Sequence, residues 1–191
     1  MRRSRIEIEP HDWNRPEPWH FATVWIRNAP SPRWLPLASR DSALAVRVTA
    51  RFYRDGSPVT TPIPCRWSDR PEPIRHDLVD PRTLGAPGGP PIVIGIPDPS
   101  LVPQSQVYDL QAGGRWEEVA VAVLRDGEVS GWGAESYFHN WHHPDWKLDR
   151  GVYDVEVRAD WQGQSKVRWF RLEYLLNDLP SFRLTEPGSS V

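Results

Sequence analysis

Alternating apolar and polar residues predict β-strands in several parts of the chain. The clearest alternation covers residues 148–161, where charged residues occupy one face. The other face is apolar and consists of Tyr153, Val155, Val157, Ala159 and Trp161. A two-residue period of this kind is typical of a strand with one buried and one solvated face. After a turn at residues 162–164, an antiparallel partner is predicted at residues 166–175, and its inward-facing residues are Phe170, Leu172 and Tyr174.

Further strands are predicted earlier in the chain. Residues 19–27 are rich in aromatic and β-branched residues and are apolar on both faces. Two other segments, 43–56 and 116–124, each have one apolar face, which holds Leu44, Val46, Val48, Ala50 and Phe52 in the first and Val119, Val121 and Val123 in the second. Short strands are predicted at residues 63–68, 92–96 and 129–132. The rest of residues 70–103 is rich in proline and predicts a long loop system.

These patterns predict an all-β fold in one domain. The 191 residues include 21 prolines and 13 glycines, which oppose long helices and favour short strands joined by turns. About seven or eight strands separated by turn signals are typical of an antiparallel two-sheet β-sandwich, here with long proline-rich loops. We therefore expect an extended N-terminal arm over residues 1–18, a single sandwich domain over residues 19–178 and a C-terminal tail over residues 179–191.

A short motif in the strongest hairpin resembles a feature of known sandwiches. It lies within residues 145–175 and consists of Leu148, Gly151, Tyr153, Val155 and Val157. This spacing resembles the tyrosine corner of immunoglobulin-like and fibronectin type III-like domains. The resemblance implies an immunoglobulin-like sandwich in which the Tyr153 hydroxyl binds the backbone a few residues upstream. It brings no catalytic residues, because such sandwiches are mostly adhesive or scaffolding modules, and the inter-sheet disulfide of true immunoglobulin domains is missing.

Charge and hydropathy limit the classes of partner. The chain has 23 basic and 25 acidic residues, a formal net charge of −2, with the two signs interspersed, so no basic stripe can follow a phosphate backbone. We expect no binding to nucleic acid. The N-terminal residues lack the apolar stretch of a signal peptide, and no window is long and apolar enough to span a membrane. Together with a single cysteine, Cys65, this predicts a soluble cytoplasmic protein without membrane partners.

One segment holds candidate metal ligands. His139, His142, His143 and Asp145 lie close together in the sequence, and imidazole and carboxylate groups ligate zinc and other divalent ions. Because Pro144 interrupts a helix, the spacing lacks the geometry of metalloprotease sites, and the alternative is a loop of half-exposed histidines. A metal-dependent hydrolase built on these residues is the third functional hypothesis. Since the chain carries no nucleophile motif or phosphate loop, we expect a non-enzymatic protein without another cofactor.

Tryptophan is unusually frequent, with 11 residues against five phenylalanines and five tyrosines. Trp161 is in phase with a buried face, whereas other tryptophans are out of phase or lie among turn residues. The predicted contact surface consists of Trp132, Trp141, Trp146, Trp169 and Arg168. Because tryptophan and arginine dominate protein interfaces, the first hypothesis is a non-catalytic interaction or scaffolding module, in a larger assembly or a homo-oligomer. The alternatives are that loops cover these rings, or that they stack on sugars in a carbohydrate-binding module.

Overall fold

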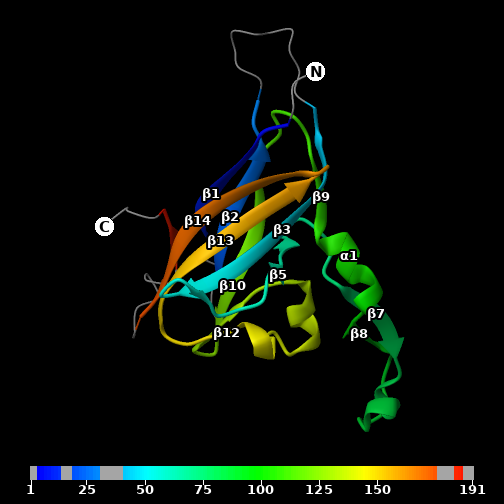
Figure 1. Ribbon diagram of the computed structural model, residues 1–191. Helices are drawn as coiled ribbons and strands as arrows, with labels where there is room; N and C mark the ends of the chain where they lie inside the picture. The colour runs from blue at the N-terminus through cyan, green and yellow to red at the C-terminus, as the bar shows by residue number, and fades with distance from the viewer. Residues whose placement is uncertain (1–3, 14–18, 31–40, 176–182, 187–191) are drawn as a thin grey trace.

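Two antiparallel β-sheets pack face to face in the computed structural model (Figure 1). The structure describes residues 4–13, 19–30, 41–175 and 183–186. The first sheet has the order β1 (Ile6–Trp13), β2 (Trp19–Asn28), β10 (Glu117–Arg125), β11 (Glu128–Gly131) and β12 (Lys147–Leu148), and β6 (Arg66–Trp67) also pairs with β10. The predicted all-β sandwich is therefore confirmed.

The second sheet is centred on the strands with the clearest sequence pattern. Its order is β15 (Leu184–Thr185), β14 (Gln164–Tyr174), β13 (Gly151–Trp161), β3 (Ala43–Arg54) and β4 (Ser57–Pro58), with β5 (Ile63–Pro64) and β9 (Val107–Leu110) also paired to β3. The apolar faces predicted for β13 and β14 are buried in the core between the sheets, as expected. Helical segments are short and comprise η1 (Pro81–Leu84), η2 (Pro99–Leu101), α1 (Val102–Ser105), η3 (Ala134–Phe138) and η4 (Pro144–Trp146).

Both ends of the described chain take part in the sheets. The expectation of an N-terminal arm is wrong for Ile6–Trp13, because Ile6 and Ile8 are buried in the core and β1 pairs with β2 along its whole length. Two alternating isoleucines are too short a pattern to distinguish a strand from an arm. In the predicted C-terminal tail, Leu184 is buried and β15 pairs with β14.

A β-bulge changes the predicted face of β3. The pairing of β3 with β9 shifts between Ala43 and Val46, and Ala45 has a positive φ of 53°. The Ala45 N–H donates a hydrogen bond to the Asp109 carboxylate at 2.7 Å, which holds this irregular backbone. As a result Ala43 is buried and Leu44 is 44% exposed, so the prediction that Leu44 faces inward is wrong.

A second bulge divides the predicted apolar face of β10. Its pairing with β2 shifts between Ala120 and Ala122. Val119 and Val121 lie in the core between the sheets, whereas Val123 lies with a second apolar cluster on the outer face. An extra residue in one strand reverses the faces of all residues after it, so the prediction of one common face is wrong for Val123.

The tyrosine of the predicted corner makes the hydrogen bond expected of it. The buried Tyr153 hydroxyl donates to the backbone carbonyl of Asp149, four residues upstream. Arg54 Nη2 donates to the same hydroxyl at 2.9 Å and to the Arg150 carbonyl at 2.6 Å. A Cβ atom at Gly151 would lie 2.0 Å from Arg54 Nη2, so a side chain there would displace the guanidinium from these two hydrogen bonds.

A two-stranded ribbon extends away from the sandwich. It consists of β7 (Ile74–Val79) and β8 (Ile92–Pro97), and η1 lies in the connection between them (Figure 1). The strand predicted at residues 92–96 is confirmed, whereas the loop predicted over Ile74–Val79 is wrong. The sequence of β7 places charged residues between its apolar ends without a two-residue period, so hydrophobic alternation could not reveal this strand.

Candidate functional site

An aromatic cluster covers the outer face of the first sheet. It comprises Trp19, Phe21, Trp132, Tyr137 and Trp141. Trp19 and Phe21 come from the outward face of β2, and Val123 joins them because of the bulge in β10. Tyr137 in η3 and Trp141 after it place their rings over this face. One apolar face of the strand predicted at residues 19–27 therefore lies in the core, and on the other face Trp19 and Phe21 belong to this cluster.

The rings of the aromatic cluster interlock. Trp132 and Trp141 are stacked at 5.5 Å with an interplanar angle of 8°. The edge of Trp19 meets Trp141 at 4.8 Å, and the edge of Phe21 meets Trp132 at 5.2 Å. Offset-stacked and edge-to-face pairs at these separations each contribute about 0.5–1.5 kcal/mol beyond the area that they bury. The cluster is thus a rigid platform rather than a set of independent rings.

The backbone that carries Trp141 is strained. Asn140 and Trp141 both have positive φ angles, 48° and 73°, in a region that bulky residues rarely adopt. The Trp141 N–H donates to the Ser136 carbonyl at 2.8 Å, which fixes the turn. Strain of this kind costs of order 1–3 kcal/mol and is concentrated at functional sites, so the placement of the Trp141 ring marks this region as a candidate site.

A pocket of about 320 Å³ opens beside the aromatic cluster. Its lining consists of rings of the cluster together with the polar side chains of Arg66, Ser68 and Glu72. Arg66 Nη2 donates to the Arg70 carbonyl, whereas the buried Nε atom of Arg66 has no hydrogen-bond partner within the described part of the chain. The pocket therefore combines indole surfaces with guanidinium, hydroxyl and carboxylate side chains.

A second arginine lies against the cluster. The Arg125 guanidinium is 4.1 Å from the centroid of Trp19 and 6.0 Å from that of Trp141. A guanidinium over an indole is attracted by the negative face of the ring. The Asp126 carboxylate lies 3.1 Å from Arg125 Nε and neutralises its charge. Arg125 consequently holds Trp19 in place without adding net charge beside the pocket.

The tryptophans of the predicted contact surface do not form one surface. Trp132 and Trp141 both belong to the aromatic cluster, where Trp132 is covered and Trp141 is partly exposed. Trp146 is only 3% exposed in the main core and stacks on His143, so the expectation that it is exposed is wrong. Trp169 is 43% exposed on the outer face of the second sheet, and its neighbour Arg168 forms an ion pair with Glu186.

The histidine segment does not assemble a metal site. The rings of His139 and His143 are in edge contact at 4.4 Å, but His143 Nδ1 accepts a hydrogen bond from the Asp145 N–H at 3.3 Å. The other side of the His143 ring is stacked on Trp146. No group of three or more His, Cys, Asp or Glu residues in the described ranges could hold a metal ion, so the site predicted from His139, His142, His143 and Asp145 is wrong. Because Pro144 starts η4, Trp146 follows within one turn and His143 stacks on it, whereas His139 is exposed.

Cys65 is buried between β5 and β6. Burial raises the pKa of its thiol to about 12, so the sulfur is protonated at neutral pH. A protonated thiol without solvent contact is neither a nucleophile nor a metal ligand. The prediction of a small residue in or near a strand is confirmed.

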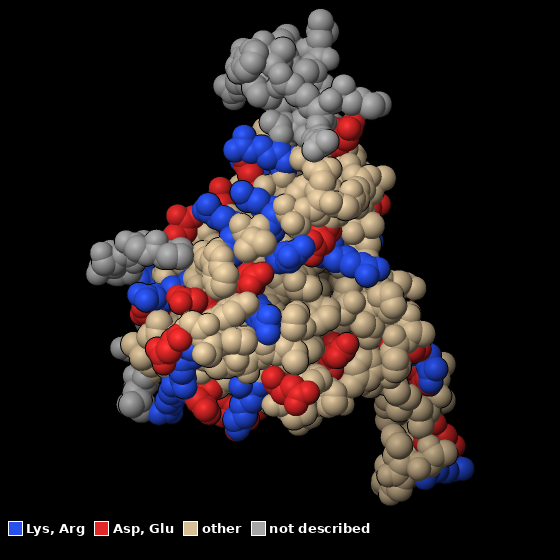
Figure 2. All heavy atoms as spheres, viewed as in Figure 1, with Lys and Arg blue, Asp and Glu red and all other residues tan. Residues whose placement is uncertain are grey.

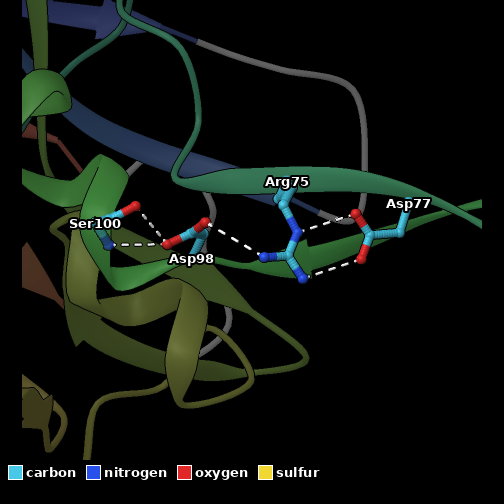
Figure 3. Close-up of polar contacts among 4 residues, drawn as sticks. All are labelled: Arg75, Asp77, Asp98 and Ser100. Carbon is cyan, nitrogen blue, oxygen red and sulfur yellow. Dashed lines mark hydrogen bonds and ion pairs between the residues drawn. The ribbon is translucent and has the colours of Figure 1, made fainter.

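The ribbon forms a second candidate surface that sequence reasoning missed. Leu78 is 74% exposed and Val93, its partner across the ribbon, is 64% exposed. Figure 2 shows that uncharged residues make up most of the visible face of this arm. At its base, Arg75 forms a two-point ion pair with Asp77 at 2.9 and 3.0 Å, and Asp98 lies between Arg75 and Ser100 (Figure 3). The charges of Arg75, Asp77 and Asp98 are therefore paired at the base of the arm, and Leu78 and Val93 remain exposed.

Comparison with protein families, curated proteins and solved structures finds no match to this chain. The resemblance to immunoglobulin-like and fibronectin type III-like sandwiches therefore stays a prediction. Within the described ranges, no helix has the length and apolar character needed to cross a membrane.

Proposed function

We propose that the protein is a non-catalytic protein-interaction module that self-associates through the ribbon formed by β7 and β8. The observation that supports this proposal is the open edge of β8, which carries no charged side chain and lies on an arm that extends away from the sandwich with Leu78 and Val93 exposed. A two-stranded ribbon is marginally stable in water by itself, and contiguous exposed apolar residues mark interaction sites. The binding surface of this proposal thus differs from the tryptophan surface that the sequence predicts.

The hydrogen-bond phase of the ribbon defines its open edge. The Asp98 N–H donates to the Pro73 carbonyl at 2.8 Å, and Ile94 lies opposite Asp77 in the same register. Hydrogen-bonded and non-hydrogen-bonded pairs alternate in an antiparallel ladder, so Ile94 directs its backbone groups to β7. Val93 and Gly95 then direct their N–H and C=O groups outward. No described strand other than β7 pairs with β8.

The open edge of β8 is suited to pairing with a second copy. An antiparallel arrangement around a two-fold axis at Ile94 places Val93 opposite Gly95 of the other copy and forms four backbone hydrogen bonds. Pro91 and Pro97 flank this window and lack an N–H, so the pairing ends there. Proteins block exposed edges with charged side chains, but β8 contains none.

The side-chain faces are also compatible with this pairing. Leu78 and Val93 lie on one face of the ribbon, because they are directly opposite each other. Pairing of the two β8 strands joins the ribbons into a four-stranded sheet. Leu78 and Val93 of both copies then lie on the same face of this sheet and form one apolar surface. Charges at Arg75 and Asp77 lie in β7, away from the pairing edge.

The non-catalytic character and a cytoplasmic location belong to the same proposal. The chain's single cysteine is buried and protonated, and no disulfide stabilises the fold. A domain that is stable without disulfides suits a reducing compartment.

Molar mass measured by light scattering tests the proposal. We expect a dimer for the wild-type protein and a monomer for Val93→Lys, because lysine at the edge places like charges close to the two-fold axis. Leu44→Lys is the matched control, since Leu44 is exposed on the sandwich and its variant should remain dimeric. A monomeric wild-type protein at every concentration, or a dimeric Val93→Lys variant, would contradict self-association through β8.

A further inference from the structure

The pocket beside the aromatic cluster has the features of a ligand site that is separate from the open edge of β8. Its volume of about 320 Å³ lies at the lower end of the range of about 300–1,000 Å³ for small-molecule pockets. Its lining includes the partly exposed indoles of Trp19 and Trp141 and the polar side chains of Arg66, Ser68 and Glu72. Convergence of a few polar groups on an apolar surface is typical of small-molecule recognition.

The three polar side chains of the lining suit a ligand that both donates and accepts hydrogen bonds. The Arg66 guanidinium only donates, so a ligand that contacts it has to offer an oxygen acceptor. The Glu72 carboxylate only accepts, and the Ser68 hydroxyl does both. Hydroxyl groups match all three side chains, since each hydroxyl can donate to a carboxylate and accept from a guanidinium.

Charge selects against ionic ligands. Arg66 disfavours a cation such as a quaternary ammonium, although aromatic rings alone would attract it. Glu72 disfavours a carboxylate, although Arg66 alone would bind it. The two opposite charges in the lining favour a neutral ligand, and Arg125 is paired with Asp126.

We propose that this pocket binds a neutral pyranose ring of a carbohydrate. The C–H face of the sugar packs against the partly exposed indoles of Trp19 and Trp141, and its hydroxyls bind Arg66, Ser68 and Glu72. The strained backbone at Trp141 holds the indole at the pocket before the ligand arrives, which lowers the ordering cost of binding. The small volume limits recognition to one or two sugar units.

Saturation-transfer NMR with neutral methyl glycopyranosides and disaccharides tests the proposal, with tetramethylammonium and benzoate as ionic probes. We expect binding of at least one neutral sugar with a dissociation constant of about 1 mM and no binding of either ion. Glu72→Gln should weaken sugar binding by about tenfold, because it removes a charge-assisted acceptor from an exposed position without disturbing the core. Trp169→Ala, an exposed tryptophan on the other sheet, should leave binding unchanged.

Three outcomes would overturn the proposal. These are the absence of binding by every neutral sugar, preferential binding of either ionic probe, and loss of sugar binding in Trp169→Ala with retention in Glu72→Gln. Because Glu72 is outside the β8 edge, the light-scattering result for the ribbon and the sugar-binding result can fail separately.

Discussion

Replacing Tyr153 by phenylalanine removes one hydroxyl from the start of β13 and leaves the ring in place. The hydroxyl donates to the Asp149 carbonyl and accepts from Arg54 at 2.9 Å, and the side chain is buried. Loss of a partner at a buried polar group costs about 1–3 kcal/mol. We therefore expect Tyr153→Phe to lower the free energy of unfolding by about 2 kcal/mol.

Tyr53→Phe is the matched control for this prediction. Tyr53 lies on the outer face of β3, where its half-exposed hydroxyl donates to the Glu156 carboxylate at 2.9 Å. Water can replace this bond, so we expect a loss under about 1 kcal/mol. Urea unfolding followed by tryptophan fluorescence, at one fixed protein concentration, measures both variants. An equal loss for the two variants, or a larger one for Tyr53→Phe, would refute the structural role given to the Tyr153 hydroxyl.

Three further predictions address burial and titration. Trp132→Ala should lower the free energy of unfolding by about 3–5 kcal/mol and Trp169→Ala by under about 1 kcal/mol in the same urea experiment, and equal losses would contradict the burial difference. Cys65 should resist alkylation at pH 8 in the folded protein and react once urea unfolds the chain, because its thiol is buried and its pKa is about 12; rapid labelling of the folded protein would contradict this. Burial lowers the pKa of His143 in the folded state, so its contribution to stability is present above the ordinary pKa of about 6.5 and is lost as the pH falls below it. His143→Gln should therefore reduce the loss of stability between about pH 7 and pH 5, and an unchanged pH dependence would argue against a lowered pKa.

Hydrophobic alternation predicts the strands whose two faces meet different surroundings. The buried faces of β13 and β14 follow directly from the sequence, because one face of each lies in the core and the other in water. The same reasoning assigns Leu44 and Val123 to the wrong face, because each strand contains a bulge that shifts the alternation. A bulge inserts one residue without a local sequence signal, so every position beyond it changes face.

The candidate sites were harder to predict because they depend on tertiary neighbours. Two of the predicted contact residues, Trp132 and Trp141, lie in the aromatic cluster, and the apolar character of both faces of residues 19–27 was the signal for its location. Trp146 has the same local surroundings of turn residues as Trp141, yet it packs into the core. Arg66 and Glu72, which also line the pocket, are distant in the sequence from the aromatic residues, and no local pattern predicts that they lie beside them.

For the ribbon, the sequence predicts one of the two strands but not its exposure. Strand β8 is predicted by its short apolar run, but exposure is decided by whether another layer covers it, and that layer is absent among the described residues. The proline-rich composition of residues 70–103 predicts a loop, although β7 and β8 within it pair with each other. The exposed edge of β8 depends on the position of the ribbon relative to the sandwich, which hydrophobic alternation does not determine.

Amide hydrogen exchange at Val93 and Gly95, measured by NMR at low and high protein concentration, tests self-association most directly. Their N–H groups point away from β7, so they should exchange rapidly in the monomer and slowly in the dimer. The amides of Ile94 and Ile96, which face β7, are the internal control and should differ little between the two concentrations. We predict slower exchange at Val93 and Gly95 alone as the concentration rises; rapid exchange at both positions at every concentration would contradict pairing through β8.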